Sequence, residues 1–140
     1  MLRNDKGMTL VEIMIVLVIL GGLSAILITN VVDKMNNAKY KEAKLQMTKI
    51  QDTLNSFYAD CNFFPTTDMG LEVLVEDPGE SCPDWGPEPY MKRVPKDPWG
   101  GDFYYEYDEE DGGEPILISY GGDKREGGKA SDKDISSENF

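Results

Sequence analysis

The chain has 140 residues and a formal net charge of −12, with no histidine and only two cysteines. The charge is uneven: residues 33–50 carry five lysines against two acidic residues, whereas residues 51–140 carry seven basic and 22 acidic residues. Nucleic-acid binding requires a basic surface, so this balance argues against that class of function. The length leaves room for one small domain after the apolar N-terminal stretch.

An apolar stretch begins directly after Gly7 and runs from Met8 to about Val32. As a helix rising 1.5 Å per residue, it is long enough to cross a hydrocarbon core of about 30 Å. The leader before it is charged and no comparable basic cluster directly follows it, which favours a cytoplasmic N-terminus and an exported C-terminal part. The stretch is too long for the apolar core of a cleavable secretory signal, which has about 7–15 residues.

One carboxylate, that of Glu12, lies inside this apolar stretch. A charged side chain at the centre of a membrane helix costs about 2.5–3.5 kcal/mol, so such a residue is functional by default. The alternative is an ordinary signal anchor that carries an incidental glutamate.

The order glycine, hydrophobic residue, Thr-Leu-Val-Glu and a long apolar helix resembles the class III signal of type IV pilins and pseudopilins. The resemblance implies that residues 1–7 are a leader, which a prepilin peptidase cuts off between Gly7 and Met8, and that Met8 is then N-methylated. It also implies that Glu12 pairs with the N-terminal amine of a neighbouring subunit. Physical reasoning agrees, because a buried carboxylate needs a cation and the Met8 amine reaches back to Glu12 poorly within one helix.

The helical pattern continues beyond the apolar stretch. Apolar residues spaced three and four apart predict an amphipathic helix, and its stripe consists of Ala43, Met47, Ile50, Leu54, Phe57 and Cys61. With no proline before Pro65, we expect one helix from about Met8 to about Ala59. A kink or a close helix contact is expected at Gly21-Gly22.

The rest of the chain predicts an α+β fold, in which this long helix packs on a small antiparallel sheet. The globular domain comprises residues 33–140, including the second half of the helix. Its expected elements are a short helix at 69–75 capped by Thr67 or Asp68, a proline-rich loop at 77–89, and strands at 102–107 and 116–120. The two strands form a hairpin whose apolar face packs on the Leu54/Phe57 stripe, because a hairpin alone is marginal in water.

Cys61 and Cys82 both lie in the part of the chain that we expect to be exported. Outside a reducing compartment two cysteines indicate one disulfide, which stabilises by about 3 kcal/mol in the chain-entropy model. The alternatives are a zinc site, disfavoured because the chain has no histidine and the cysteines are far apart in sequence, and a redox pair.

Three further motifs narrow the family resemblance to one branch of the pilins and pseudopilins. They are Pro65-Thr66-Thr67 followed by Gly70-Leu71, Pro95-Lys96-Asp97-Pro98-Trp99-Gly100, and Ile118-Ser119-Tyr120-Gly121-Gly122-Asp123 with the later Asp132-Lys133-Asp134-Ile135. Together they resemble the major pseudopilins of type II secretion systems over nearly the whole chain. The departures are the Cys61/Cys82 pair, the acidic turn at 108–111 and the C-terminal Ser-Ser-Glu-Asn-Phe.

This resemblance implies a structural subunit, not an enzyme, that polymerises through its N-terminal helix into a periplasmic pseudopilus and helps to drive folded proteins across the outer membrane. It implies a single-pass inner-membrane protein with a periplasmic domain. The implied partners are further copies of the chain, minor pseudopilins, the inner-membrane assembly platform, the prepilin peptidase and the outer-membrane secretin channel.

Three other functions remain as alternatives. A type IV pilin of a surface fibre, for adhesion, motility or DNA uptake, is disfavoured by the Asp-Pro-Trp-Gly turn and the aspartate-rich C-terminal loop. A membrane-anchored enzyme lacks a histidine base and a Gly-x-Ser-x-Gly motif. A membrane-anchored calcium-binding module that never polymerises would gain nothing from a buried Glu12.

The stretch from Gly121 to Asp134 places turn-forming glycines among carboxylates. Ca²⁺ takes six to eight oxygen ligands, which such a loop offers, although the EF-hand spacing is absent and the residues alone favour a solvated loop. The major pseudopilins fold this loop around one calcium ion with aspartate side chains and main-chain carbonyls. The resemblance therefore implies calcium ligands at Asp123 and Asp132, with Asp134 and the main-chain carbonyl of Tyr120 as further candidates.

Overall fold

The computed structural model describes residues 8–110, 112–129 and 132–139, and for residues 26–30 it describes the backbone alone. The chain forms two units, residues 1–37 and residues 38–140. The expected leader and Gly7 lie outside the described residues. The fold class is the α+β class that the sequence predicts, with one long helix and one small antiparallel sheet.

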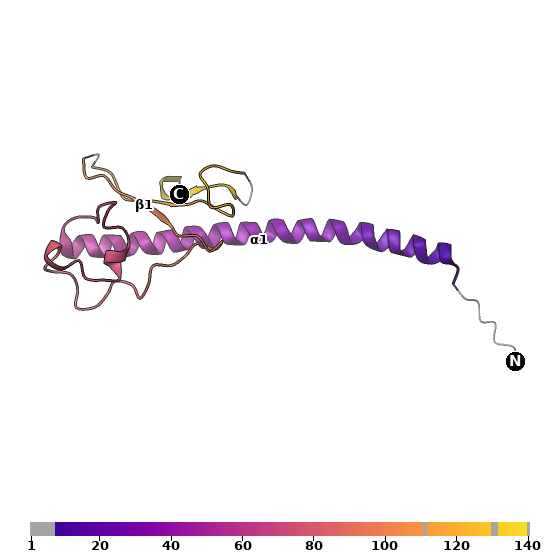
Figure 1. Cartoon of the computed structure of the whole chain (residues 1–140), viewed down its shortest axis with the longest axis horizontal. Helices are drawn as coiled ribbons and strands as arrows, with labels where there is room; N and C mark the ends of the chain where they lie inside the picture. Colours follow the sequence, from indigo (N-terminus) through magenta and orange to yellow (C-terminus); the bar gives the residue numbers. More distant parts are fainter. Residues whose placement is uncertain (1–7, 111, 130–131, 140) are drawn as a thin grey trace. The chain divides into compact units, whose positions relative to one another are not determined.

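Helix α1 spans Leu10–Cys61 and belongs to both units (Figure 1). This confirms the single long helix predicted from about Met8 to about Ala59, and the helix runs through Gly21 and Gly22. It ends where Asn62 takes the left-handed conformation, with φ 61°, and donates its N–H to the carbonyl of Tyr58 at 2.8 Å. Such a left-handed residue is a common helix terminator.

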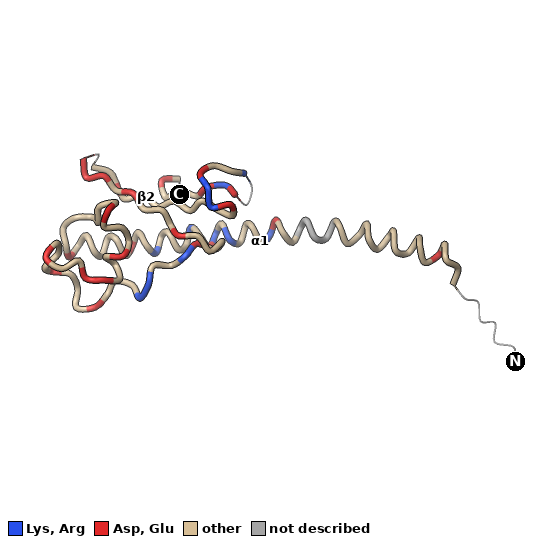
Figure 2. The backbone as a smooth tube through the Cα atoms, viewed as in Figure 1, with Lys and Arg blue, Asp and Glu red and all other residues tan. Residues whose placement is uncertain are grey.

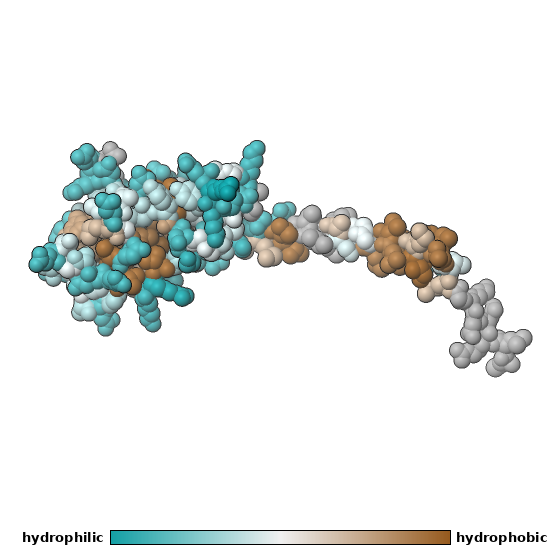
Figure 3. Space-filling view, viewed as in Figure 1, coloured by the Kyte–Doolittle hydropathy of each residue, from teal (hydrophilic) through white to brown (hydrophobic). Residues whose placement is uncertain are grey.

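In the first unit, apolar side chains of α1 are exposed all round the helix. Leu10 is 76% exposed and Val18 is 74% exposed, and the helix surface there is strongly hydrophobic (Figure 3). Among the residues whose placement is described, no helix combines the length and the apolar character needed to cross a membrane. The membrane-spanning segment expected at 8–32 stays a prediction.

The core of the second unit is built on the predicted stripe. Ala43, Met47, Ile50, Leu54 and Phe57 are all buried, and Cys61 is partly buried. They share one cluster with residues from the loops and strands, namely Leu71, Val73, Leu74, Phe103, Tyr105, Leu117 and Ile135. At about 25 cal/mol per Å² of apolar area, this burial is the main stabilising term of the unit.

The sheet has three short antiparallel strands in the order β1-β2-β3. Strand β1 spans Tyr104–Glu106, β2 spans Ile116–Ser119 and β3 spans Ile135–Ser136. Tyr105 lies opposite Leu117, and both are buried on the face that joins the core. The predicted hairpin and its packing on the helical stripe are confirmed, with shorter strands than expected, whereas β3 was not predicted.

The short helix predicted at 69–75 is wrong as an α-helix, because only a 3-10 turn, η1, forms at Glu72–Leu74. Its N-cap is Leu71, so the predicted cap at Thr67 or Asp68 is wrong too. The physical reason is Gly70, whose φ of 65° places it in the left-handed region and interrupts the helix.

The proline-rich stretch 77–89 is a loop except for a second 3-10 turn, η2, at Gly79–Ser81. A disulfide joins Cys61, at the end of α1, to Cys82 in this loop, as predicted. The hydroxyl of Tyr90 also donates to the carboxylate of Asp60 at 2.6 Å. The loop and the residue after it, Tyr90, are therefore attached to the end of the helix by the disulfide and by this hydrogen bond.

Charge is distributed unevenly over the second unit. Lysines gather on α1 between residues 39 and 49, whereas acidic residues dominate the loops (Figure 2).

The last described segment is a 3-10 turn, η4, at Ser137–Asn139.

Candidate functional site

Glu12 lies in the first turn of α1, where it forms a capping box with Thr9. The amide of Glu12 donates to the Thr9 hydroxyl at 3.3 Å, and the amide of Thr9 donates to the Glu12 carboxylate at 3.4 Å. These reciprocal bonds satisfy two amides that a helix start leaves unpaired. The Thr-x-x-Glu spacing is typical of this arrangement, which comes in addition to the intermolecular role that the family resemblance implies for Glu12.

The Glu12 side chain is exposed within a surface of apolar side chains. Met8, the first described residue, is also exposed. The carboxylate is therefore accessible to a second molecule, and within the described part of the chain it accepts the amide of Thr9.

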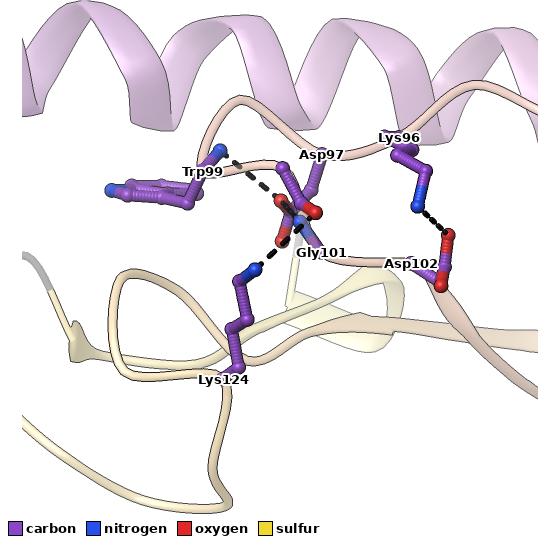
Figure 4. Close-up of polar contacts among 7 residues, drawn as sticks. Lys96, Asp97, Trp99, Gly101, Asp102 and Lys124 are labelled. Atoms are coloured by element: carbon purple, nitrogen blue, oxygen red, sulfur yellow. Dashed lines mark hydrogen bonds and ion pairs between the residues drawn. The ribbon is translucent and has the colours of Figure 1, made fainter.

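A second polar centre lies in the turn at residues 97–101, which the Asp-Pro-Trp-Gly motif forms. The Asp97 carboxylate is only 5% exposed. Its Oδ1 accepts the amides of Trp99 at 3.1 Å and Gly101 at 2.6 Å (Figure 4). Its Oδ2 accepts the hydroxyl of Ser119 at 2.7 Å. In the sequence this motif serves only as a family signature, and the burial of its carboxylate is not apparent there.

The turn is closed tightly around this carboxylate. A Cβ added to Gly101 would lie 3.1 Å from Oδ2 of Asp97, closer than most real contacts, so the Asp97 carboxylate would have to shift by a few tenths of an ångström to admit it. Beside the turn, Lys96 and Asp102 form an exposed ion pair at 3.2 Å, and the Lys124 ammonium donates to the Gly100 carbonyl at 3.4 Å (Figure 4).

The C-terminal loop, residues 120–134, contains the predicted calcium ligands. Oδ1 of Asp123 accepts the amide of Arg125 at 3.1 Å, which is a local turn contact. Oδ2 of Asp134 accepts the amide of Gly127 at 2.7 Å across the loop. The other oxygen of Asp134, Oδ1, is buried and has no hydrogen-bond partner among the described residues. A buried carboxylate oxygen without a partner is costly, and a bound cation would satisfy it.

Two tyrosines on either side of this loop have raised pKa values. Burial raises the pKa of Tyr40 most, and the charges of Asp132 and Asp134 raise it further, against a lowering by the hydrogen bond to the Lys133 carbonyl. Burial also raises the pKa of Tyr120, with contributions that include Asp134. For both tyrosines burial is the largest cause of the raised pKa, and the nearby carboxylates add to it.

Within the described part of the chain, no group of three or more histidine, cysteine, aspartate or glutamate side chains is arranged to hold a metal ion. Asp123, Asp132 and Asp134 are thus not brought together as a three-carboxylate cluster. The feature of the described residues that fits a cation is the unpartnered oxygen of Asp134, and Ca²⁺ accepts main-chain carbonyls as well as carboxylates as ligands.

Two family models of known proteins match this chain. Residues 2–28 match the family model of the prokaryotic N-terminal methylation motif. Residues 30–138 match the model of type II secretion system (T2SS) protein G. The chain therefore belongs to the T2SS protein G family.

Relatives support this membership over the whole length. The chain is 35% identical over 140 residues to the type II secretion system core protein G of Vibrio cholerae serotype O1, covering 99% of this chain and 95% of the relative. It is 39% identical over 136 residues to the Pseudomonas aeruginosa core protein G, covering 95% and 94%.

The fold matches a solved structure as well. The crystal structure of the major pseudopilin from the type 2 secretion system of enterohaemorrhagic Escherichia coli superposes with a TM-score of 0.66. The match has 24% identity and covers 79% of this chain and 96% of that one. The family comparisons confirm the predicted resemblance and favour the pseudopilin branch over a surface type IV pilin.

Proposed function

We propose that this chain is the structural subunit of a periplasmic pseudopilus, which helps a type II secretion system to drive folded proteins across the outer membrane. One observation carries the proposal. In a chain of this family, α1 exposes apolar side chains all round its first turns, with one carboxylate among them. Exposed apolar surface on this scale needs either lipid or other subunits to cover it.

The proposed location is the inner membrane, crossed once by residues 8–32, with the domain of residues 33–140 in the periplasm. The leader is cut between Gly7 and Met8, and Met8 is N-methylated. The match of residues 2–28 to the methylation motif supports this processing. The disulfide between Cys61 and Cys82 is consistent with an oxidising compartment.

Intact-mass spectrometry of the protein from membranes of its native host tests the processing. The expected mass is that of a chain beginning at Met8 and heavier by one methyl group. An intact N-terminus at Met1, or a cut near Ala25, would contradict the proposal.

Glu12 is proposed to pair with the N-terminal amine of a neighbouring subunit, so that the charge of each is compensated when the apolar surfaces meet. Glu12→Ala removes both this charge and the capping box. Glu12→Gln is the sharper variant, because its amide oxygen still accepts the Thr9 amide while the charge is gone.

We expect both variants to reach the membrane and neither to form fibres, as judged by shearing, sedimentation and electron microscopy. Fibres of Glu12→Gln in normal amount would refute the charge pairing. Loss of assembly in Glu12→Ala alone would assign the defect to the capping box.

A calcium ion is proposed in the C-terminal loop, with Asp134 as its first ligand. The buried, unpartnered Oδ1 of Asp134 supports it. The family resemblance adds Asp123, Asp132 and the main-chain carbonyl of Tyr120 as further ligands, which the ion would have to draw together, since the three carboxylates do not form a cluster among the described residues. Calcium should raise the Tm of the full chain in detergent relative to EGTA, and Asp134→Asn should remove most of that increase. Equal Tm values of the unaltered chain with calcium and with EGTA would contradict this proposal.

The further partners are proposed from the family alone. They are minor pseudopilins, the inner-membrane assembly platform, the prepilin peptidase and the outer-membrane secretin channel. We propose no catalytic role and no nucleic-acid partner for the chain, in keeping with its acidic surface and structural family.

A further inference from the structure

We propose that Asp97 is a positioning residue for the calcium site: the turn at 97–101 aligns both arms of the C-terminal loop. The first arm leaves β2 after Ser119, and the second arm returns to β3 at Ile135. This inference rests on the calcium site proposed above and assigns the residues that hold its ligands in place.

The first arm is held through one hydroxyl. Ser119 is fully buried, and its Oγ donates to Oδ2 of Asp97 at 2.7 Å and accepts the amide of Gly121 at 3.4 Å. The Gly121 amide and the Tyr120 carbonyl belong to one planar peptide unit. A bond that fixes the direction of this N–H therefore fixes the direction of the carbonyl proposed as a calcium ligand.

The hydroxyl itself has a defined orientation because of Asp97. The carboxylate is held by the amides of Trp99 and Gly101 on its other oxygen, so Oδ2 is presented to Ser119. Since a carboxylate only accepts hydrogen bonds, the Ser119 proton must point to Asp97, which leaves the Ser119 lone pairs for the Gly121 amide.

The second arm is held to the same turn through Tyr40. The ring of Trp99 packs edge-on against the ring of Tyr40, with centroids 5.4 Å apart. The Tyr40 hydroxyl donates to the Lys133 carbonyl at 2.9 Å. That carbonyl shares a peptide unit with the amide of Asp134, so this contact sets the backbone from which the Asp134 carboxylate extends.

The turn therefore contacts the loop on both sides. Lys124, inside the loop, adds a third contact by donating to the Gly100 carbonyl. Partners behind metal ligands tune metal affinity by orienting those ligands, and their loss typically costs about 10–100-fold in affinity. Because both oxygens of Asp97 already accept hydrogen bonds, from the amides of Trp99 and Gly101 and from the Ser119 hydroxyl, Asp97 acts through Ser119 and does not itself bind the ion.

Calcium titration calorimetry of the full chain in detergent tests the inference. The test variants are Ser119→Ala and Asp97→Asn, and the control is Ser137→Ala. Ser137 is also a buried serine, and its hydroxyl accepts the Leu117 amide at 3.0 Å, on β2 but not at the loop. Each variant is also melted in EGTA, which measures stability without calcium.

We expect Ser119→Ala to weaken calcium binding by about 10–100-fold. We expect Ser137→Ala to keep the affinity of the unaltered chain, although it too lowers the Tm in EGTA. Asp97→Asn should follow Ser119→Ala, and if it does not fold, Ser119→Ala decides alone.

The outcomes separate two failures. If the unaltered chain does not bind calcium, the calcium site itself is wrong. If it binds calcium and Ser119→Ala binds equally well, the site stands and the positioning role is wrong. If Ser137→Ala weakens binding as much as Ser119→Ala, the loss follows from general destabilisation, which also refutes the positioning role.

Discussion

The disulfide between Cys61 and Cys82 gives the most direct prediction for stability. The double variant Cys61→Ala, Cys82→Ala removes the bond without introducing a polar group at the buried Cys82. The loop remains attached by other contacts, since Tyr90 donates to Asp60 and the indole N–H of Trp85 donates to the Val73 carbonyl at 2.8 Å. We therefore expect the variant to fold to the same structure.

The magnitude follows from the loop that the bond closes. The two cysteines are 21 residues apart in sequence. The chain-entropy relation for this separation gives about 11 cal/mol/K, which corresponds to about 3 kcal/mol at 25 °C. For a unit of roughly 100 residues, a loss of 1 kcal/mol lowers the Tm by about 4–8 °C. The Tm of the double variant is therefore expected to be lower by about 12–24 °C.

Thermal unfolding of the full chain in detergent, followed by tryptophan fluorescence, measures this change. Trp85 reports on the loop directly, because its amide donates to the Cys82 carbonyl at 3.0 Å. Reductant should lower the Tm of the unaltered chain by a similar amount and leave the double variant unchanged. A decrease of less than about 1 kcal/mol would refute the loop-entropy argument, since that is well below what the relation gives.

Three further predictions concern the core and the Asp97 turn. Phe57→Ala should lower the free energy of unfolding, measured in urea, by about 3–5 kcal/mol, because Phe57 is fully buried. Leu45→Ala, on the exposed side of α1, should change it by less than about 0.5 kcal/mol. Burial raises the pKa of Tyr105 above its ordinary value of 10.0, so its contribution to stability is complete below pH 10 and is lost as the pH rises further. Urea titrations from pH 8 to about 11.5 should show a shallower alkaline loss for Tyr105→Phe than for the unaltered chain, and equal slopes would contradict this assignment. Gly101→Ala should lower the free energy of unfolding by about 1–3 kcal/mol, because the new Cβ would crowd the Asp97 carboxylate. An unchanged free energy of unfolding in urea would show that the turn accommodates a side chain.

Strong periodic patterns made most of the fold predictable. The three-and-four spacing from Ala43 to Phe57 and the lack of proline before Pro65 are local properties, and they predicted both α1 and its buried stripe. The hairpin was predictable because each strand is rich in aromatic or β-branched residues. The disulfide followed from cysteine count and compartment.

Two features that the sequence did not predict, β3 and the burial of Asp97, depend on contacts between distant residues. Strand β3 has two residues, too few to show an alternating pattern, and it forms only because β2 offers an edge. The burial of Asp97 depends on Ser119, 22 residues further along the chain. The helix predicted at 69–75 failed for a local reason that could have been weighed, namely a glycine within it.

The position of β2 at the centre of the sheet has a consequence for biosynthesis. Its inner edge pairs with β1, but its outer edge pairs with β3, which comes from the last residues of the chain. Until those residues have been synthesised and have reached β2, the outer edge of β2 is an open strand, the kind of edge that recruits other chains. Truncation shortly before Ile135 would leave that edge open permanently, so such fragments should aggregate or be degraded.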